Sequence, residues 1–418
     1  MKIQHLFCAT IGIVSMFACS TQSKHREVST TDNVSVSEIM YSSDYAEESA
    51  IEISSRADIR PGLKRQVAAN LLTATEINDF KKWDEWEELL LKDFSSYKNG
   101  WRIIPENRFV ASVADYNQRP VPDVETKLYD SKGKLIWSTR TDNTGVAQLW
   151  MGMYKNVNNQ SGRIYPPYRI EFTYGNEKKV IENAQPYPQM TNVVKMSVKS
   201  RPSSNVDLFF IIDATGSMSD ELRYLQAELY DIIKQVRVKQ SNLDIRVGSL
   251  VYRDHGDDYL TRKSSLDPDI NKTLDFLKKQ AADGGGDTPE AVDEALYQAI
   301  QCEDWSKEAL SRLAFLVLDA PPHDDDKSIR RVHEQVTLAA IKGIRLIPLV
   351  ASGMDQNGEY LMRAIALATN GTYVALTDDS GIGNSHEVPT TNYYKVEKLN
   401  DLLIRLIDDY TRIPQTIG

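Results

Sequence analysis

Four short polar runs in the C-terminal half carry the residue types best suited to bind a cation. Each run holds carboxylate side chains, with or without hydroxyls, and the runs are 213–219, 252–258, 284–290 and 319–326. Two like charges about 4 Å apart repel by roughly 4 kcal/mol at an effective dielectric of about 20, so converging carboxylates call for a cation. Oxygen donors suit Mg²⁺, Mn²⁺ or Ca²⁺, whereas zinc favours thiolates and imidazoles.

Alternating strand-like and helical patterns predict the scaffold that brings these runs together. Strands are expected at 207–212, 245–252, 314–318, 344–350 and 372–375, and helices at 219–238, 289–303, 325–342, 357–369 and 396–411. This alternation is typical of a doubly wound, Rossmann-like α/β fold with a mainly parallel sheet. Because ligands of such sheets collect beyond the carboxyl ends of the strands, the polar runs are expected at one edge.

The order of residues in these runs resembles the metal-ion-dependent adhesion site of the von Willebrand factor A (vWA) family. Asp213, Thr215 and Ser217 match its Asp-x-Ser-x-Ser motif, with Thr for the first Ser, and Thr288 and Asp319 match its later Thr and Asp. The resemblance implies that the three hydroxyls bind Mg²⁺ (or Mn²⁺ or Ca²⁺), with both carboxylates holding it directly or through waters. It also implies a protein partner that presents an Asp or Glu to the metal.

Further residues at the same edge are expected to form the rim of this site, with a solvated acidic rim as the alternative. They are Asp254, His255, Asp287 and His323. The motif residues also have structural explanations when each is taken alone. Ser217 or Ser219 fits a helix cap, and Thr288 before Pro289 fits an N-cap followed by proline at the first helical position.

The same residues allow an enzyme hypothesis. The run 213–217 also resembles the Asp-x-x-Gly-Thr loop of haloacid-dehalogenase-type phosphotransferases, which implies that Asp213 is a nucleophile beside Mg²⁺. Against this, Ser217 stands where that family prefers Thr, and Thr288 has no assigned role. We therefore expect a binding module and no enzyme, with a surface spacer that carries a vestigial metal site as the third hypothesis.

The N-terminal residues predict where in the cell the protein is located. Residues 1–18 combine Lys2 with an apolar stretch, which predicts a signal peptide. The end of the stretch with Cys19 resembles the lipobox of bacterial lipoproteins, which implies a lipid anchor on Cys19; simple cleavage leaving a free thiol is the alternative. Residues 19–60 are polar and predict a flexible tether. The expected location is the bacterial cell envelope, at the outer membrane or cell surface, facing the periplasm or the exterior.

The middle of the chain changes character twice. Apolar residues spaced three and four apart predict a helix from 75 to 94, within a helical segment at 61–100. Short β-rich runs joined by turns predict an all-β sandwich at 101–202, followed by the α/β domain at 203–418. The turns resemble those of prealbumin-like β-sandwich repeats found in bacterial surface and carboxypeptidase-associated proteins, which implies a spacer or binding platform.

Composition and charge exclude several classes of protein. The 418 residues are 41% hydrophobic and 26% charged, which is ordinary for a multidomain globular protein and unlike a disordered or fibrous one. Residues 203–418 hold 23 basic and 35 acidic residues of the chain's 49 and 59, an acidity that opposes nucleic-acid binding. Three cysteines cannot build a disulfide framework, and Cys302 is expected to be a buried thiol.

Overall fold

The computed structural model describes residues 72–155, 165–286, 288–377, 389–392 and 394–417. The predicted signal peptide, the predicted tether, Cys19 and Asp287 lie outside these residues. Among the residues that are described, no helix has both the length and the apolar character needed to cross a membrane.

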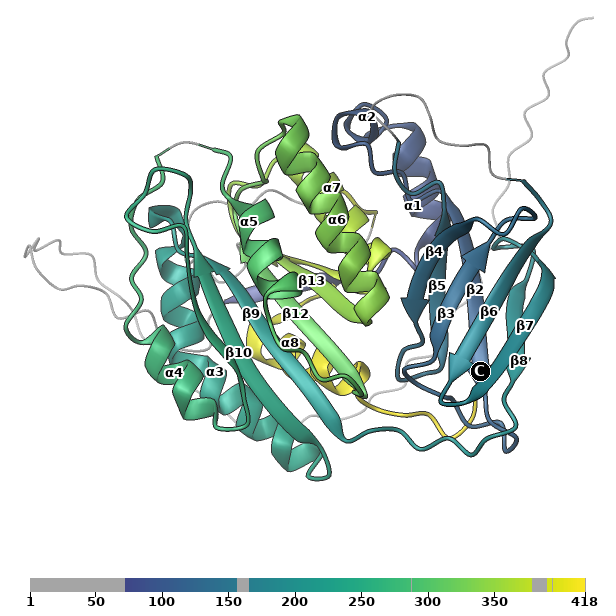
Figure 1. Cartoon of the computed structure of the whole chain (residues 1–418). Coiled ribbons are helices and arrows are strands. Elements are labelled where there is room, and N and C mark those ends of the chain that lie inside the picture. Colours follow the sequence, from purple (N-terminus) through teal and green to yellow (C-terminus); the bar gives the residue numbers. More distant parts are fainter. Residues whose placement is uncertain (1–71, 156–164, 287, 378–388, 393, 418) are drawn as a thin grey trace, which may run out of the picture. The chain divides into compact units, whose positions relative to one another are not determined.

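An eight-stranded sheet forms the α/β region (Figure 1). Its five parallel strands are β10 (Asp244–Tyr252), β9 (Asn205–Asp213), β12 (Ser311–Leu318), β13 (Ile344–Val350) and β14 (Tyr373–Thr377). Three antiparallel strands complete it: β11 (Thr261–Asp267), β1 (Thr73–Ile77) and β15 (Val396–Lys398). The mainly parallel α/β fold predicted from the sequence is confirmed, and the five parallel strands lie where they were expected.

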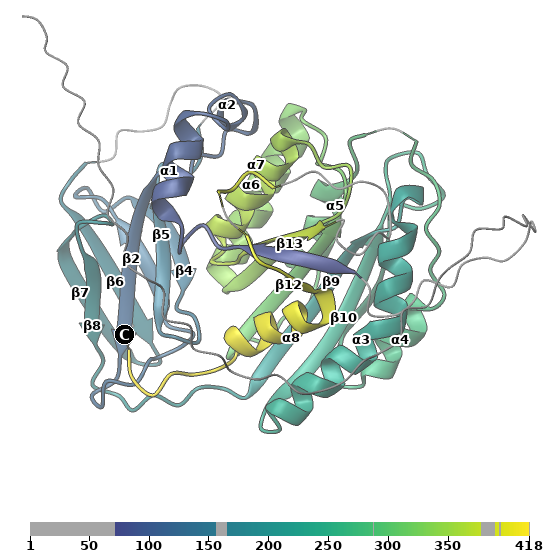
Figure 2. The same cartoon turned by 180° about the vertical axis from the view of Figure 1, so that it is seen from behind.

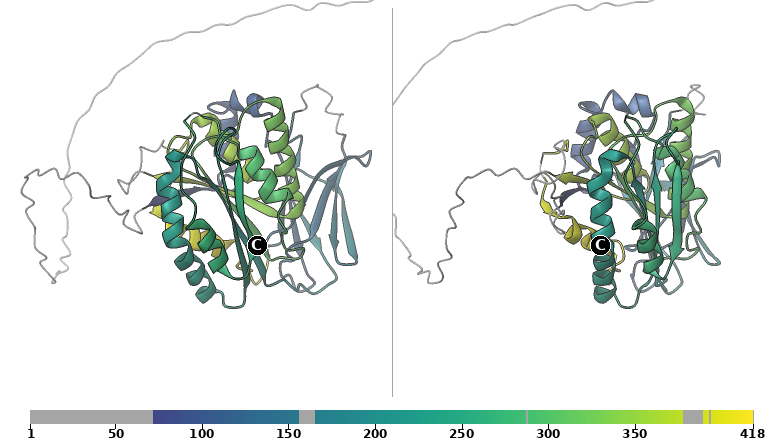
Figure 3. Two further views of the ribbon diagram at one scale, coloured as in Figure 1. Left: turned by 60° about the vertical axis from the view of Figure 1, so that its left-hand side comes forward. Right: turned by 90° about the vertical axis from the view of Figure 1, so that its left-hand side faces the viewer.

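Helices cover both faces of this sheet (Figures 2 and 3). One layer consists of α3 (Ser219–Lys239), α4 (Ile270–Leu277) and α8 (Leu399–Asp409), and the other of α5 (Val292–Leu296), α6 (Asp326–Lys342) and α7 (Gln356–Ala368). Strand β9 shows why both layers are needed, since its side chains alternate between two apolar cores. Phe209 and Ile211 belong to one core, whereas Phe210 and Ile212 belong to the other.

The described part of the segment predicted as helical, from residue 72 onward, starts with a strand. β1 pairs with β14 on one side and with β15 on the other, so residues from before the β-rich region complete the α/β sheet. The prediction of one helix from 75 to 94 is therefore wrong at its start, because hydrogen bonds to distant strands fix these residues as extended. Within residues 72–101, the helices are α1 (Trp83–Leu91) and the short α2 (Tyr97–Trp101). The Trp-bearing face of α1 is buried as predicted, and Trp86 stacks on Tyr360 of α7.

Between β1 and β9 the chain forms two smaller sheets. A three-stranded sheet contains β5 (Val146–Met151), β2 (Asn107–Ala114) and β8 (Thr191–Lys195), and a four-stranded sheet contains β4 (Leu135–Arg140), β3 (Glu125–Tyr129), β6 (Tyr168–Tyr174) and β7 (Glu177–Ala184). Apolar side chains of both sheets, such as Phe109 of β2 and Phe172 of β6, are fully buried in the same core. The region is β-rich as predicted.

Turn residues of the β-rich region contact the α/β region directly. The amide of Asn143 donates to the backbone carbonyls of Asp409 (2.9 Å) and Arg412 (2.6 Å). The carboxylate of Asp123 accepts two hydrogen bonds from the guanidinium of Arg312, at 2.9 and 3.2 Å. The predicted turns therefore also act as docking points. One prediction about a single residue is wrong: Cys302 is exposed, since it lies in the turn that follows the helical residues 292–301.

Candidate functional site

Three chain segments meet at the carboxyl ends of β9 and β12. Asp213 is the last residue of β9, and Asp319 directly follows β12, the strand paired with β9. The loop that contains Thr288 joins them because the backbone N–H of Glu290 donates to the carbonyl of Pro321 at 3.0 Å. The segments enclose a cleft of 550 Å³, lined by Thr215, Gly216, Ser217, Gly284, Gly285, Gly286, Thr288, Glu290, Asp319, Ala320 and Gly353.

Asp213 lies fully buried beside this cleft, with its two carboxylate oxygens in different situations. Oδ1 accepts hydrogen bonds from the backbone N–H of Thr215 at 2.8 Å and from its Oγ1 at 2.7 Å. Oδ2 is buried and accepts no hydrogen bond, although the buried hydroxyl of Tyr252, which also has no partner, lies close enough to lower the pKa of Asp213. The Oγ1 of Thr215 is also 3.4 Å from the Oγ of Ser217, which brings both hydroxyls of the predicted motif together.

The helix-capping alternatives for the motif hydroxyls are wrong. Helix α3 begins at Ser219, and no side chain caps its first turn. Helix α5 begins only at Val292, after an N-cap at Ala291, so neither Thr288 nor Pro289 has the position that capping requires. Four of the five predicted metal-binding residues line the cleft instead, and the fifth, Asp213, is hydrogen-bonded to one of them.

The carboxyl groups here lack compensating positive charge. The pKa of Asp213 is raised to about 7, mainly because the group is buried and to a smaller extent because Asp319 repels its charge. Burial also raises the pKa of Asp319 itself. The pKa of Glu290 rises to about 9, first because the group is buried and then because Asp213, Asp254 and Asp319 repel its charge. Without a cation, these groups are therefore easier to protonate than they would be in water.

These observations fit a divalent cation. A buried carboxylate oxygen without a partner, a second carboxylate and several hydroxyls form a hard-oxygen donor set. Among the described residues, no three His, Cys, Asp or Glu side chains are arranged to hold a metal by themselves. A cation in this cleft would therefore also need oxygen donors such as the hydroxyls of Thr215, Ser217 and Thr288, which line it.

Three of the four predicted rim residues can be placed. The Nε2 of His323 lies 2.8 Å from the Oδ1 of Asp254, and the rings of His255 and His323 are 5.7 Å apart. None of the three is among the residues that line the cleft. Their loop is linked to the cleft because Asp257 accepts a hydrogen bond from the backbone N–H of Gly285 at 3.2 Å.

The sequence prediction missed Glu290. This residue is buried, lines the cleft, and has an Oε2 without a hydrogen-bond partner. The expected helix 289–303 puts it in a first turn, where carboxylates are common and mostly solvated. A signal was present in the preceding glycines: a Cβ on Gly285 would lie 3.1 Å from the Cβ of Thr215 and 3.4 Å from the Oε1 of Glu290. The glycine allows these two side chains to approach.

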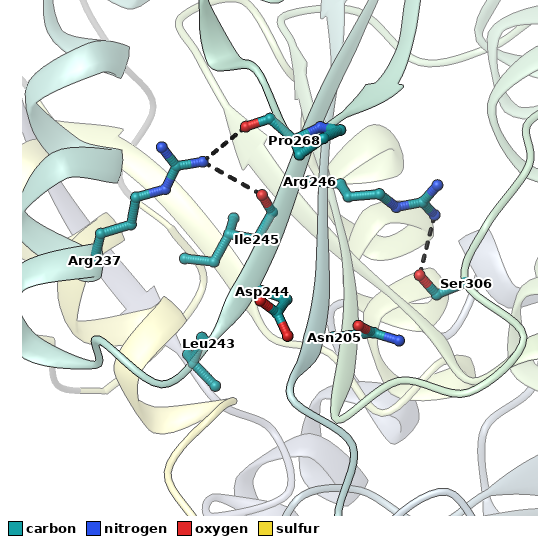
Figure 4. Close-up of a pocket in the computed structure, with 8 residues that line it drawn as sticks. All are labelled: Asn205, Arg237, Leu243, Asp244, Ile245, Arg246, Pro268 and Ser306. Atoms are coloured by element: carbon teal, nitrogen blue, oxygen red, sulfur yellow. Dashed lines mark hydrogen bonds between the residues drawn. The ribbon is translucent and has the colours of Figure 1, made fainter.

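A second hollow, of 480 Å³, lies at the opposite ends of β9 and β10 (Figure 4). Its polar groups are paired within the protein. The guanidinium of Arg237 donates to the carbonyls of Ile245 (3.3 Å) and Pro268 (3.1 Å), and Arg246 donates to Ser306 (3.1 Å). The charge of Arg246 is balanced by a bidentate salt bridge with the carboxylate of Asp207. This hollow offers no unpaired donor set for a ligand.

Comparison with known proteins finds a similarity that covers part of the α/β region. Residues 207–384 match the profile of the von Willebrand factor A domain. An alpha-protein kinase, vwkA, of Dictyostelium discoideum is 24% identical over 231 residues, which is 54% of this chain and 36% of that protein. A putative ariadne-like RING finger protein, R811, of Acanthamoeba polyphaga mimivirus is 33% identical over 118 residues, which is 28% of this chain and 11% of that protein. The matched part is thus a minor portion of each relative.

Proposed function

We propose that the von Willebrand factor A domain formed by residues 207–384 is a protein-binding module whose partner is recognised through a divalent cation. One observation carries the proposal: the Oδ2 of Asp213 is buried without a partner, next to the hydroxyls that line the cleft. A buried, unpaired carboxylate is costly unless a cation or a proton neutralises it. Mg²⁺ is the expected cation, with Mn²⁺ or Ca²⁺ as alternatives.

Each predicted ligand has a defined task in this proposal. The hydroxyls of Thr215, Ser217 and Thr288 would hold the cation through oxygen, and Asp213 and Asp319 would hold it directly or through waters. The hydroxyl of Thr215 donates a hydrogen bond to the Oδ1 of Asp213, which orients that carboxylate. When bound, the cation supplies a Lewis-acidic position for one carboxylate of a partner's Asp or Glu. The acidic surroundings oppose nucleic acid as that partner.

The wider setting is also a proposal. A lipid on Cys19 would anchor the chain in the bacterial cell envelope, and residues 19–60 would hold the folded part away from the membrane. The β-rich region between β1 and β9 would serve as a prealbumin-like platform. Its contacts to Arg312 and to the end of α8 favour a fixed orientation over a loose spacer.

Thermal unfolding of the full chain, in EDTA and then with MgCl₂ or MnCl₂, tests the cation site. We expect the metal to raise the melting temperature of the native protein and to leave that of Asp213→Ala unchanged. Asp244→Asn, at the opposite end of the sheet, is the control and should respond like the native protein. If neither metal changes the melting temperature of the native protein, the result contradicts the proposal and favours the spacer hypothesis.

Partner binding and the enzyme hypothesis need separate measurements. Pull-down from bacterial envelope extracts should recover a protein with metal present, and lose it in EDTA and with Asp213→Ala. Phosphatase turnover and fluoroberyllate binding that depend on Asp213 would instead favour a phosphotransferase of haloacid-dehalogenase type. These two results separate a cation that bridges proteins from one that assists phosphate chemistry.

A further inference from the structure

Glu290 is placed in the cleft by its backbone. Its N–H donates to the carbonyl of Pro321 at 3.0 Å, and residues 290 and 322 form an isolated parallel β-bridge. These contacts tie Glu290 to the segment that begins with Asp319. The side chain is only 3% exposed, although it belongs to a residue type that is almost never fully buried without a partner.

The carboxylate of Glu290 lacks the partners that usually compensate a buried charge. Its Oε2 has no hydrogen-bond partner, and within the described part of the chain no Lys, Arg or His forms an ion pair with it. By contrast, the equally buried Glu303 is paired with Lys263 at 3.0 Å and accepts a hydrogen bond from the N–H of Leu266. Burial of an unpaired charge is costly, so Glu290 needs a positive group that the protein itself does not supply.

The neighbours of Glu290 sharpen this need. Its Oε1 and the side chain of Thr215 both lie close to Gly285, which has the left-handed φ of +70°: a Cβ there would be 3.4 Å from this Oε1 and 3.1 Å from the Cβ of Thr215. Charges of Asp213 and Asp319 also act on Glu290. Two independent buried oxygens without partners, Oδ2 of Asp213 and Oε2 of Glu290, therefore belong to the same small region.

We propose that Glu290 is an additional carboxylate ligand, direct or through water, for the cation that this cleft binds. The inference rests on the proposed function, because it concerns the same cation. With Glu290, three carboxylates and three hydroxyls belong to this region, and their negative charge more than offsets that of a divalent cation. Because no three acidic side chains of the described residues are arranged to hold an ion directly, at least one of these carboxylates would act through water. The chain should therefore hold its cation firmly before any partner arrives, and partner binding should not be required for metal binding.

Metal titration of the full chain tests this role of Glu290. Isothermal titration with MnCl₂, checked by the Mn²⁺ paramagnetic resonance signal, gives the affinity without reference to any partner. We expect Glu290→Gln to weaken Mn²⁺ binding by about tenfold or more. Glu228→Gln is the matched control: Glu228 is also buried, but it accepts a hydrogen bond from Asn400 away from the cleft, and its replacement should leave the affinity unchanged.

Stability in EDTA gives a second readout that a purely structural role of Glu290 would not produce. Removal of one of several repelling carboxylates should keep or raise the melting temperature of metal-free Glu290→Gln, while the rise caused by Mn²⁺ becomes smaller. If circular dichroism shows that Glu290→Gln is unfolded, Glu290→Asp takes its place. Its carboxylate is withdrawn by one methylene and should also weaken the binding.

The outcomes distinguish this inference from the proposed function. Native protein that binds Mn²⁺, together with a Glu290 variant of equal or higher affinity, overturns the role of Glu290 and leaves the cation site intact. Native protein that binds no Mn²⁺ overturns the proposed function itself. Weaker binding in the Glu290 variant with an unchanged Glu228 control supports the inference.

Discussion

Strand β9 carries one buried aspartate near each end, and the two have opposite surroundings. Asp207 and Asp213 are both fully buried. The carboxylate of Asp207 accepts hydrogen bonds from the guanidinium of Arg246 at 2.9 and 3.0 Å and from the N–H and hydroxyl of Ser306 at 2.7 and 3.0 Å. The Oδ2 of Asp213 accepts no hydrogen bond and has no positively charged neighbour like Arg246. The protein neutralises one charge internally and leaves the other open.

The pairing of polar atoms distinguishes the two hollows as candidate ligand sites more clearly than their volumes do. Both ends of β9 border a hollow, of 480 Å³ near Asp207 and 550 Å³ near Asp213. At the amino end the polar atoms already have protein partners, so a ligand would have to displace them. At the carboxyl end a cation would satisfy oxygens that have none. The comparison predicts that changes at the two ends differ in kind: one alters stability, the other metal binding.

The largest expected effect is loss of stability at the amino end. Asp207→Ala leaves Arg246 without its carboxylate and should lower the free energy of unfolding by about 3–5 kcal/mol. Asp213→Ala in EDTA removes a charge that already lacks compensation, so its cost should be much smaller. Urea unfolding in EDTA measures both. Equal losses for the two variants would contradict the contrast between the ends of β9.

The pH dependence of metal-free stability should expose the unpaired charge at Asp213. Its folded-state pKa of about 7 lies above the ordinary value of 3.8, so the folded protein holds this proton more tightly than the unfolded chain. The resulting stability is fully present below about pH 4 and is lost as the pH rises through 7, by an amount on the order of 4 kcal/mol. Glu290, with a pKa of about 9, extends the loss to alkaline pH. Melting temperatures in EDTA from pH 5 to 9 test this, with Asp213→Asn as the control that flattens the acid part.

A third, smaller effect is expected for the second carboxylate of the predicted site. Asp319→Asn keeps the shape of the side chain but removes its charge, and it should weaken Mg²⁺ and Mn²⁺ binding by about tenfold to a hundredfold. Asp244→Asn at the amino end should bind both metals like the native protein. Titration calorimetry on both variants provides the measurement, and equal affinities would place the cation elsewhere.

The sequence predicted those elements of the fold whose signal is local. Strand β9 lies between two helical layers and is therefore a continuous apolar run that stands out. β1 and β15 are short and are held by pairing across long stretches of chain, as between Thr75 and Ala375, so no local pattern announces them. Helix α4 was not predicted. Asp269 is its N-cap and accepts a hydrogen bond from the N–H of Asn271, but eight residues are too few to show a clear helical periodicity in the sequence.

The sequence could bring five candidate residues to one edge of the sheet, but it gave no role to Glu290. Asp213, Thr215, Ser217, Thr288 and Asp319 could be assigned together because the carboxyl ends of parallel strands meet, whatever the loops between them do. Glu290 could not, because its burial depends on where α5 begins. That helix starts at Val292 and not at 289, which leaves Glu290 extended beside residue 322 and directs it into the cleft.

The smallest effect is expected for Gly285, which lies close to both Thr215 and Glu290 at the carboxyl end of β9. Its φ of +70° is costly for other residues, and a Cβ would lie 3.1 Å from the Cβ of Thr215 and 3.4 Å from Glu290. Gly285→Ala should therefore lower stability by about 1 kcal/mol and push Thr215 away from Glu290, which weakens Mn²⁺ binding. Gly256→Ala separates these two causes, because Gly256 has a φ of +100° with nothing within 4 Å of its Cβ position. It should lose similar stability but keep its Mn²⁺ affinity. Equal affinities in both variants would show that the spacing of Thr215 and Glu290 does not control metal binding.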